Sequence, residues 1–101
     1  MIITGGTLVT PFETLTGHDL VIEGDKIVAI VPQGSRADAD AIDVHGLFVV
    51  PGMIDVHVHG SDGHDTMDAT PEALHGMARF FAQHGVTAYY PTTMTSPPEA
   101  I

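Results

Sequence analysis

The stretch Val49-Val50-Pro51-Gly52-Met53-Ile54-Asp55-Val56-His57-Val58-His59-Gly60 decides the fold. A run of β-forming residues stops at Pro51-Gly52 and restarts as a predicted strand over residues 53–58. Side chains alternate faces along a strand, so His57 and His59 share one face, separated by roughly 6.6 Å at the backbone. Two imidazoles at this spacing can both lean onto one metal ion.

The position of the histidine pair within its strand favours a site. Gly60 ends the strand, which leaves both histidines at its carboxyl end, where parallel α/β folds build their sites. Asp55 lies two residues earlier on the same face and could orient one of the imidazoles. Two packed or solvated histidines remain the alternative interpretation.

The second half of the chain has the strand–helix–strand pattern of a βαβ unit. Residues 70–72 (Thr-Pro-Glu) combine a hydroxyl cap, a proline at the first helical position and an acid near the positive end of the dipole. Gly85 ends the predicted helix, and a second strand follows over residues 86–90. A crossover of this length requires parallel strands. The helix is expected to bury one stripe: Leu74, Met77, Ala78 and Phe81.

These patterns divide the chain into two predicted parts. Residues 1–50 read as a small β-sandwich module, with a hairpin of strands 19–23 and 26–31 turning at Gly24-Asp25. Residues 51–101 read as the first βαβ unit of an incomplete (β/α)8 barrel. Ser96 with a glutamate three residues later has the capping-box pattern of a further helix start. Because a complete barrel needs roughly 250 residues, the sequence is expected to be an N-terminal fragment.

The amino-acid composition limits the possible metal ligands and binding partners. The chain has no cysteine, so a metal would be held by nitrogen and oxygen ligands. Thirteen acidic residues against three basic ones give a formal charge of −10, which argues against nucleic acid or anionic lipid as a partner. No apolar run approaches the roughly 20 residues that a spanning helix needs. We expect a cytoplasmic protein that binds neither nucleic acid nor a membrane.

Several segments resemble a known enzyme family. Residues 51–60 resemble the first barrel strand of the amidohydrolase superfamily, in which this histidine pair binds a divalent metal. Residues 59–70, 80–87 and 91–95 are similar to the corresponding segments of N-acetylglucosamine-6-phosphate deacetylases. The resemblance implies removal of the acetyl group from N-acetylglucosamine 6-phosphate, giving glucosamine 6-phosphate and acetate, by attack of a metal-activated water on the amide.

The same resemblance implies a set of site residues. His57 and His59 would bind a divalent metal ion, zinc foremost, with iron, manganese or cobalt as alternatives. The catalytic aspartate and the other metal ligands would lie beyond Ile101, so no catalytic residue is expected within this chain. The full-length protein is expected to be a homodimer that binds a phosphorylated amino sugar.

Five further residues are candidates for contacting the substrate or supporting the metal ligands: Asp55, His64, Asp65, Thr92 and Thr93. For His64 and Asp65, turn formation is the alternative role. Two other functions stay open. One is another amidohydrolase, dihydroorotase-like or deaminase-like, although the segment 63–68 favours the deacetylase. The other is a non-enzymatic small domain that binds a metal or a partner.

Overall fold

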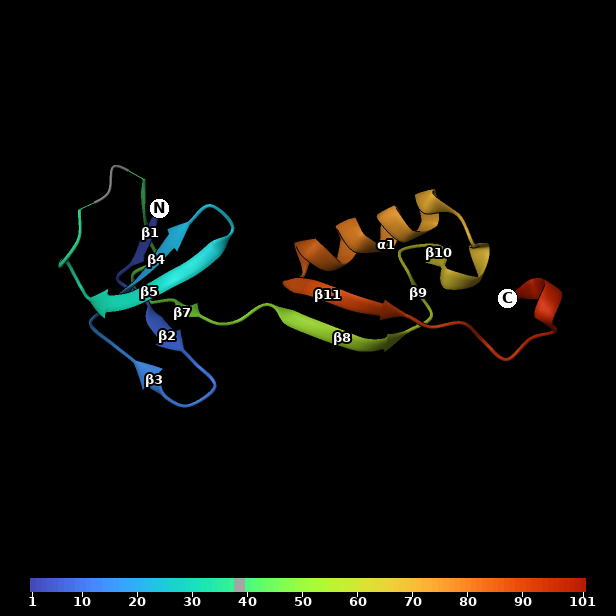
Figure 1. The fold of residues 1–101 in the computed structure, drawn as a ribbon, viewed down its shortest axis with the longest axis horizontal. Helices are drawn as coiled ribbons and strands as arrows, with labels where there is room; N and C mark the ends of the chain where they lie inside the picture. The colour runs from blue at the N-terminus through green and yellow to red at the C-terminus, as the bar shows by residue number, and fades with distance from the viewer. Residues whose placement is uncertain (38–39) are drawn as a thin grey trace. The chain divides into compact units, whose positions relative to one another are not determined.

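Strands dominate this mixed α/β chain, which the computed structural model describes over residues 1–37 and 40–101 (Figure 1). The chain divides into two compact units, Met1–Pro51 and Gly52–Ile101. Each unit has its own sheets and its own buried side chains. Within the described residues, no helix combines the length and apolar character needed to cross a membrane.

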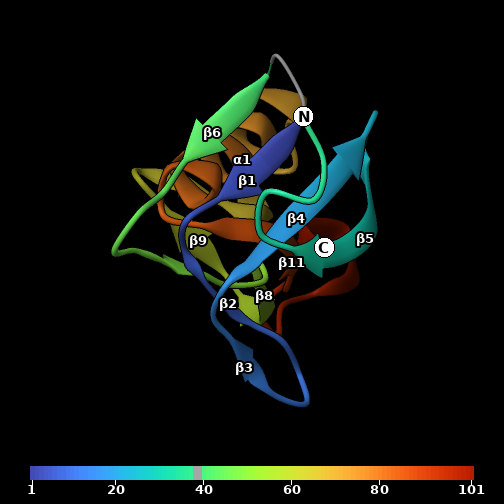
Figure 2. The ribbon, with the colours of Figure 1, turned by 90° about the vertical axis from the view of Figure 1, so that its left-hand side faces the viewer.

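The first unit consists of two small sheets. Its strands are β1 (Ile2–Thr4), β2 (Thr7–Val9), β3 (Thr14–Leu15), β4 (His18–Glu23), β5 (Lys26–Pro32), β6 (Ala41–Asp43) and β7 (Phe48–Val49). One sheet has the order β5-β4-β1-β6, which Figure 2 shows, and the other sheet has the order β3-β2-β7. The strand β1 runs antiparallel to β4 and parallel to β6, and β2 likewise runs antiparallel to β3 and parallel to β7.

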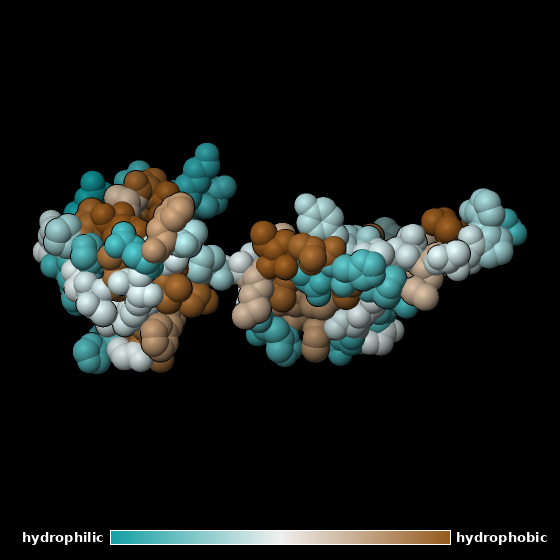
Figure 3. Space-filling model, turned by 90° about the horizontal axis from the view of Figure 1, so that it is seen from below, coloured by the Kyte–Doolittle hydropathy of each residue, from teal (hydrophilic) through white to brown (hydrophobic). Residues whose placement is uncertain are grey.

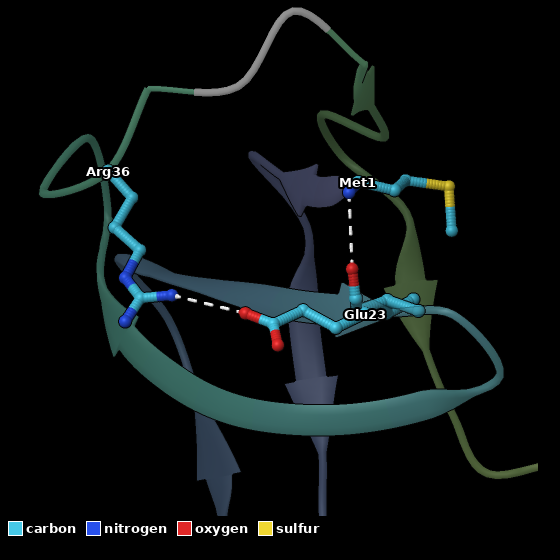
Figure 4. Close-up of polar contacts among 4 residues, drawn as sticks. Met1, Glu23 and Arg36 are labelled. Atoms are coloured by element: carbon cyan, nitrogen blue, oxygen red, sulfur yellow. Dashed lines mark hydrogen bonds and ion pairs between the residues drawn. The ribbon is translucent and has the colours of Figure 1, made fainter.

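The hairpin of β4 and β5 forms as its sequence predicts. Glu23 pairs with Lys26 across the turn, and Gly24 adopts the positive φ of 61° that such two-residue turns require. The N-terminus joins this sheet through the ammonium group of Met1, which donates to the carbonyl of Ile22 at 3.1 Å (Figure 4). Arg36 and Glu23 approach to 4.0 Å, but both side chains are exposed, so this ion pair adds little stability.

The second unit is built on two parallel strands. Its elements are β8 (Met53–Val58), β9 (Gly60–Ser61), β10 (His64–Asp65), η1 (Thr66–Asp68), α1 (Pro71–Gln83), β11 (Val86–Pro91) and η2 (Pro98–Ala100). The strands β8 and β11 are parallel, with Val86 opposite Met53 and Pro91 opposite Val58, as the βαβ pattern predicts. The strands β9 and β10 form a short antiparallel pair. In Figure 1 the helix α1 lies along β11.

The helix α1 begins as predicted, but its buried face differs from the expected stripe. The Thr70 hydroxyl accepts a hydrogen bond from the amide of Ala73 at 3.2 Å, and Pro71 is the first helical residue. Met77 and Phe81 are buried as expected, whereas Leu74 and Ala78 are only half-buried. Ala73 and Gly76 are buried in their place.

The helix start predicted at Ser96 is wrong. The short helix η2 begins only at Pro98, its preceding residue is Pro97, and no side chain caps it. Pro97 has φ −54° and ψ 147°, an extended conformation. A residue that precedes a proline is disfavoured in the helical region, so the Pro97-Pro98 pair pushes the helix start past the position that Ser96 could cap.

Each unit leaves large apolar side chains in solvent, as the brown surface in Figure 3 shows. In the second unit Ile54 is 61% exposed and Val56 is 72% exposed, and in the first unit Phe48 is 72% exposed. Exposed apolar clusters of this kind mark surfaces that associate. We therefore expect these 101 residues, expressed alone, to self-associate at micromolar concentration. Size-exclusion chromatography with light scattering tests this, and a monodisperse monomer would contradict it.

Candidate functional site

The two histidines of the predicted pair meet at the carboxyl end of β8. His57 lies in the strand and His59 follows its last residue. Their rings are 4.9 Å apart between centroids and nearly perpendicular, at 88°. The two Nε2 atoms are 3.2 Å apart. The same ring nitrogen of both residues is therefore close together, at a separation that also suits an N–H···N hydrogen bond between the rings.

The separation of the two Nε2 atoms fits two ligands of one metal ion. A tetrahedral zinc ion with Zn–N bonds of about 2.0–2.1 Å places two nitrogen ligands about 3.3–3.4 Å apart. The 3.2 Å separation of the pair is within about 0.2 Å of that value. The backbone and rotamers of His57 and His59 thus already give a spacing that an ion can use.

His59 is held from the end of the neighbouring strand. Its Nδ1 lies 2.8 Å from the carbonyl oxygen of Thr92, and the amide of Thr92 donates to the carbonyl of Val58 at 2.8 Å. A carbonyl oxygen can only accept, so Nδ1 of His59 is the donor, and in the neutral ring the lone pair is then on Nε2. Metal-binding histidines are typically oriented by such a contact on the other ring nitrogen.

Asp55 makes a different contact from the one expected. Its Oδ1 accepts a hydrogen bond from the backbone amide of His57 at 3.1 Å, and not from an imidazole. Short acidic side chains commonly fold back onto an amide two residues ahead. In the structure Asp55 therefore supports the backbone that carries His57.

His64 and Asp65 lie in the segment that follows the pair. Asp65 caps the turn η1, because its Oδ1 accepts from the amide of Met67 at 2.8 Å and its own amide donates to Asp68 Oδ2 at 2.9 Å. The half-buried ring of His64 lies against Gly76 of α1. These contacts are those of turn formation and packing.

The two threonines after β11 differ in their contacts. Thr92 reaches the pair through its main-chain carbonyl, while its hydroxyl donates to the carbonyl of Tyr90 at 3.1 Å. Thr93 is exposed. Position at a strand end was signal enough to single out Thr92, but side-chain chemistry did not indicate that its backbone would make the contact.

The described residues do not form a complete metal site around the pair. Among residues 1–37 and 40–101, no group of three or more histidine, aspartate, glutamate or cysteine side chains is arranged to hold an ion. Catalytic zinc sites commonly use three protein ligands and one water. His57 and His59 would therefore need at least one further ligand from outside these residues.

No family model matches the chain, but individual proteins do. An N-acetylglucosamine-6-phosphate deacetylase of Vibrio furnissii is 48% identical over 77 residues, which cover 76% of this chain and 19% of that protein. A dihydroorotase of Streptococcus thermophilus is 34% identical over 98 residues, covering 96% of this chain and 22% of that protein. The chain spans about a fifth of the length of the curated relatives it matches.

Solved structures agree with the sequence matches. The N-acetylglucosamine-6-phosphate deacetylase of Pasteurella multocida superposes with a TM-score of 0.92 at 32% identity, covering 98% of this chain and 27% of that one. A mutant of the Mycobacterium smegmatis deacetylase, solved in complex with N-acetyl-D-glucosamine-6-phosphate, has a TM-score of 0.89 at 31% identity and covers 99% and 26%. These likenesses define a protein of the amidohydrolase superfamily. Within it, the chain belongs to the N-acetylglucosamine-6-phosphate deacetylase family.

Proposed function

We propose that the full-length protein removes the acetyl group from N-acetylglucosamine 6-phosphate, giving glucosamine 6-phosphate and acetate. This chain would form the N-terminal part of that enzyme. The observation that carries the proposal is the 3.2 Å separation of the two Nε2 atoms at the carboxyl end of a parallel strand. Membership of the deacetylase family supplies the substrate class.

His57 and His59 are the proposed metal ligands within this chain. A divalent ion held there would activate a water molecule and polarise the acetamide carbonyl. Nitrogen ligands favour zinc, with iron, manganese and cobalt as alternatives. His59 is prepared for this role by its Nδ1 hydrogen bond to Thr92, which leaves the Nε2 lone pair directed at the ion. The catalytic aspartate and the remaining ligands belong to the part of the protein beyond Ile101.

We propose further that residues 51–101 are the first βαβ unit of a (β/α)8 barrel and that residues 1–50 are a separate small β-sandwich module. The parallel pairing of β8 with β11 supports the first part of this proposal. Ile54, Val56 and Tyr90 on these strands are all more than half exposed, and neighbouring strands and helices of a barrel would cover them.

Charge indicates where the phosphate of the substrate would bind. The chain has only three lysine or arginine residues against thirteen acids, so it is a poor source of cations for a phosphate group. The cations would come from later parts of the chain or from a second subunit of a homodimer. The same charge balance is the reason to expect no nucleic acid or membrane partner. A sugar phosphate is too strongly charged to cross a bilayer unaided, so we propose that the enzyme that acts on it is located in the cytoplasm.

A substrate comparison tests the proposed reaction. The full-length enzyme with added zinc is offered N-acetylglucosamine 6-phosphate, N-acetylglucosamine and dihydroorotate, and release of acetate or ring opening is followed. We expect turnover of the phosphorylated sugar at least tenfold faster than of the others, since phosphate contacts add binding energy in the transition state. The dihydroorotase relative makes ring opening the second candidate. Turnover of dihydroorotate alone would refute the deacetylase and leave the metal pair intact.

A further inference from the structure

His64 lies in a seat formed by two glycines. A Cβ atom built on Gly76, in the middle of α1, would overlap the imidazole ring of His64. A Cβ atom built on Gly60 would overlap the carbonyl oxygen of His64. Glycine is unfavourable inside a helix, so Gly76 is explained by the ring it accommodates rather than by helix formation.

The segment that carries His64 also holds His59. Gly60 directly follows His59, and the amide of Thr66, two residues after His64, donates to the carbonyl of His59 at 2.7 Å. Between these points the chain is fixed by the pairing of β9 with β10 and by the contacts of Asp65 in η1. A displacement of the His64 backbone would therefore reach the backbone of His59.

We propose that His64 is a positioning residue: seated on Gly60 and Gly76, it fixes the 60–68 segment and through it the imidazole of His59. The proposal deepens the proposed function, on which it rests for the ion that His59 would bind. It assigns His64 no direct contact with that ion. The seat itself is defined by the packing of this chain alone.

A set of alanine variants of the full-length protein tests the contacts of the two glycines with His64 separately. Gly76→Ala and Gly60→Ala are each made with His64 and with His64→Ala, and zinc affinity is measured by competition with a chromophoric chelator. Thermal unfolding and the ¹⁵N signals of His59 are recorded on the metal-free protein. His75→Ala is the matched control, because His75 is an exposed histidine beside Gly76 on the same helix.

The two glycine variants should respond differently to the loss of the His64 ring. Gly76→Ala is expected to lower zinc affinity about tenfold, as loss of a supporting contact does, and to mix the tautomers of His59. With His64→Ala the clash is gone, so Gly76→Ala should then leave affinity unchanged and raise the melting temperature. Gly60→Ala should lower affinity in both backgrounds, since the backbone carbonyl it meets remains. His64→Ala alone should keep full zinc stoichiometry with a severalfold weaker affinity, and His75→Ala should match the wild type.

Two results of the zinc measurements would overturn the proposal. Loss of zinc stoichiometry in His64→Ala would identify His64 as a metal ligand. Equal effects of Gly76→Ala on zinc affinity in both backgrounds would show that the contact between Gly76 and the His64 ring is not the cause of the effect. If the wild type bound no zinc, the proposed function would fail instead. The His59 tautomer in the metal-free protein would still decide the positioning role, because a Gly76→Ala variant with an unchanged ¹⁵N spectrum refutes it.

Discussion

Replacing His57 and His59 together with asparagine is expected to remove the proposed ion from the full-length protein while leaving it folded. Asparagine keeps a polar side chain of moderate size but supplies no imidazole nitrogen. Loss of a supporting contact around a metal commonly costs about 10–100-fold in affinity, so loss of two ligands should cost more than about a hundredfold. Acetate release from N-acetylglucosamine 6-phosphate should disappear with the ion.

Elemental analysis of the purified double variant measures the result directly. The matched control is His45→Asn with His75→Asn, which makes the same two chemical changes at exposed histidines. The control should keep the metal content of the wild type, and circular dichroism should show the same helix and strand content in both variants. An unchanged metal content after replacement of His57 and His59 would exclude them as ligands.

The parts of the fold that depend on local rules could be predicted from the sequence. The strand 53–58 has the same bounds in the structure, and the Gly24-Asp25 turn joins its two strands as expected. The start of α1 follows from the Thr70 hydroxyl and Pro71. Each of these features depends on residues within a few positions of one another, so the sequence contains the whole of the physical cause.

The buried face of α1 was harder to predict because tertiary contacts decide it. Apolar character selected Leu74 and Ala78, but the structure buries Ala73 and Gly76 instead. Gly76 has no hydrophobic side chain to reveal its place, and its partner, the ring of His64, lies in a different element. A glycine inside a helical pattern was the signal that could have indicated a close approach.

The histidine pair illustrates the same limit at the site. Alternation along a strand predicts that the two rings share a face, and the structure has them 3.2 Å apart at Nε2. The contacts that orient the pair are main-chain contacts: Thr92 lies 33 positions from His59, and Asp55 bonds an amide rather than a ring. Side-chain identity carries no information about such backbone partners, so sequence reasoning named Thr92 by position alone.

Replacing Met77 with alanine is expected to give the largest loss of stability in the second unit. Met77 is 0% exposed, the most completely buried side chain of α1. Removing a buried methionine side chain costs about 2–5 kcal/mol through lost burial and the cavity left behind. The other contacts of the helix, such as the bond from the Tyr89 hydroxyl to the carbonyl of Leu74 at 2.8 Å, do not fill that cavity.

Hydrogen exchange of the full-length protein locates this loss. Amides of α1 should exchange faster in Met77→Ala, since local opening of the helix becomes less costly. Arg79→Ala on the exposed side of the same helix is the control and should change stability by less than about 0.5 kcal/mol. Because Gly76 sits beside Met77, loosening α1 also loosens the seat of His64, yet both proposed ligands remain. Zinc affinity should therefore fall far less than after replacement of His57 and His59. Equal amide exchange rates in Met77→Ala and Arg79→Ala would show that the buried face does not stabilise the helix.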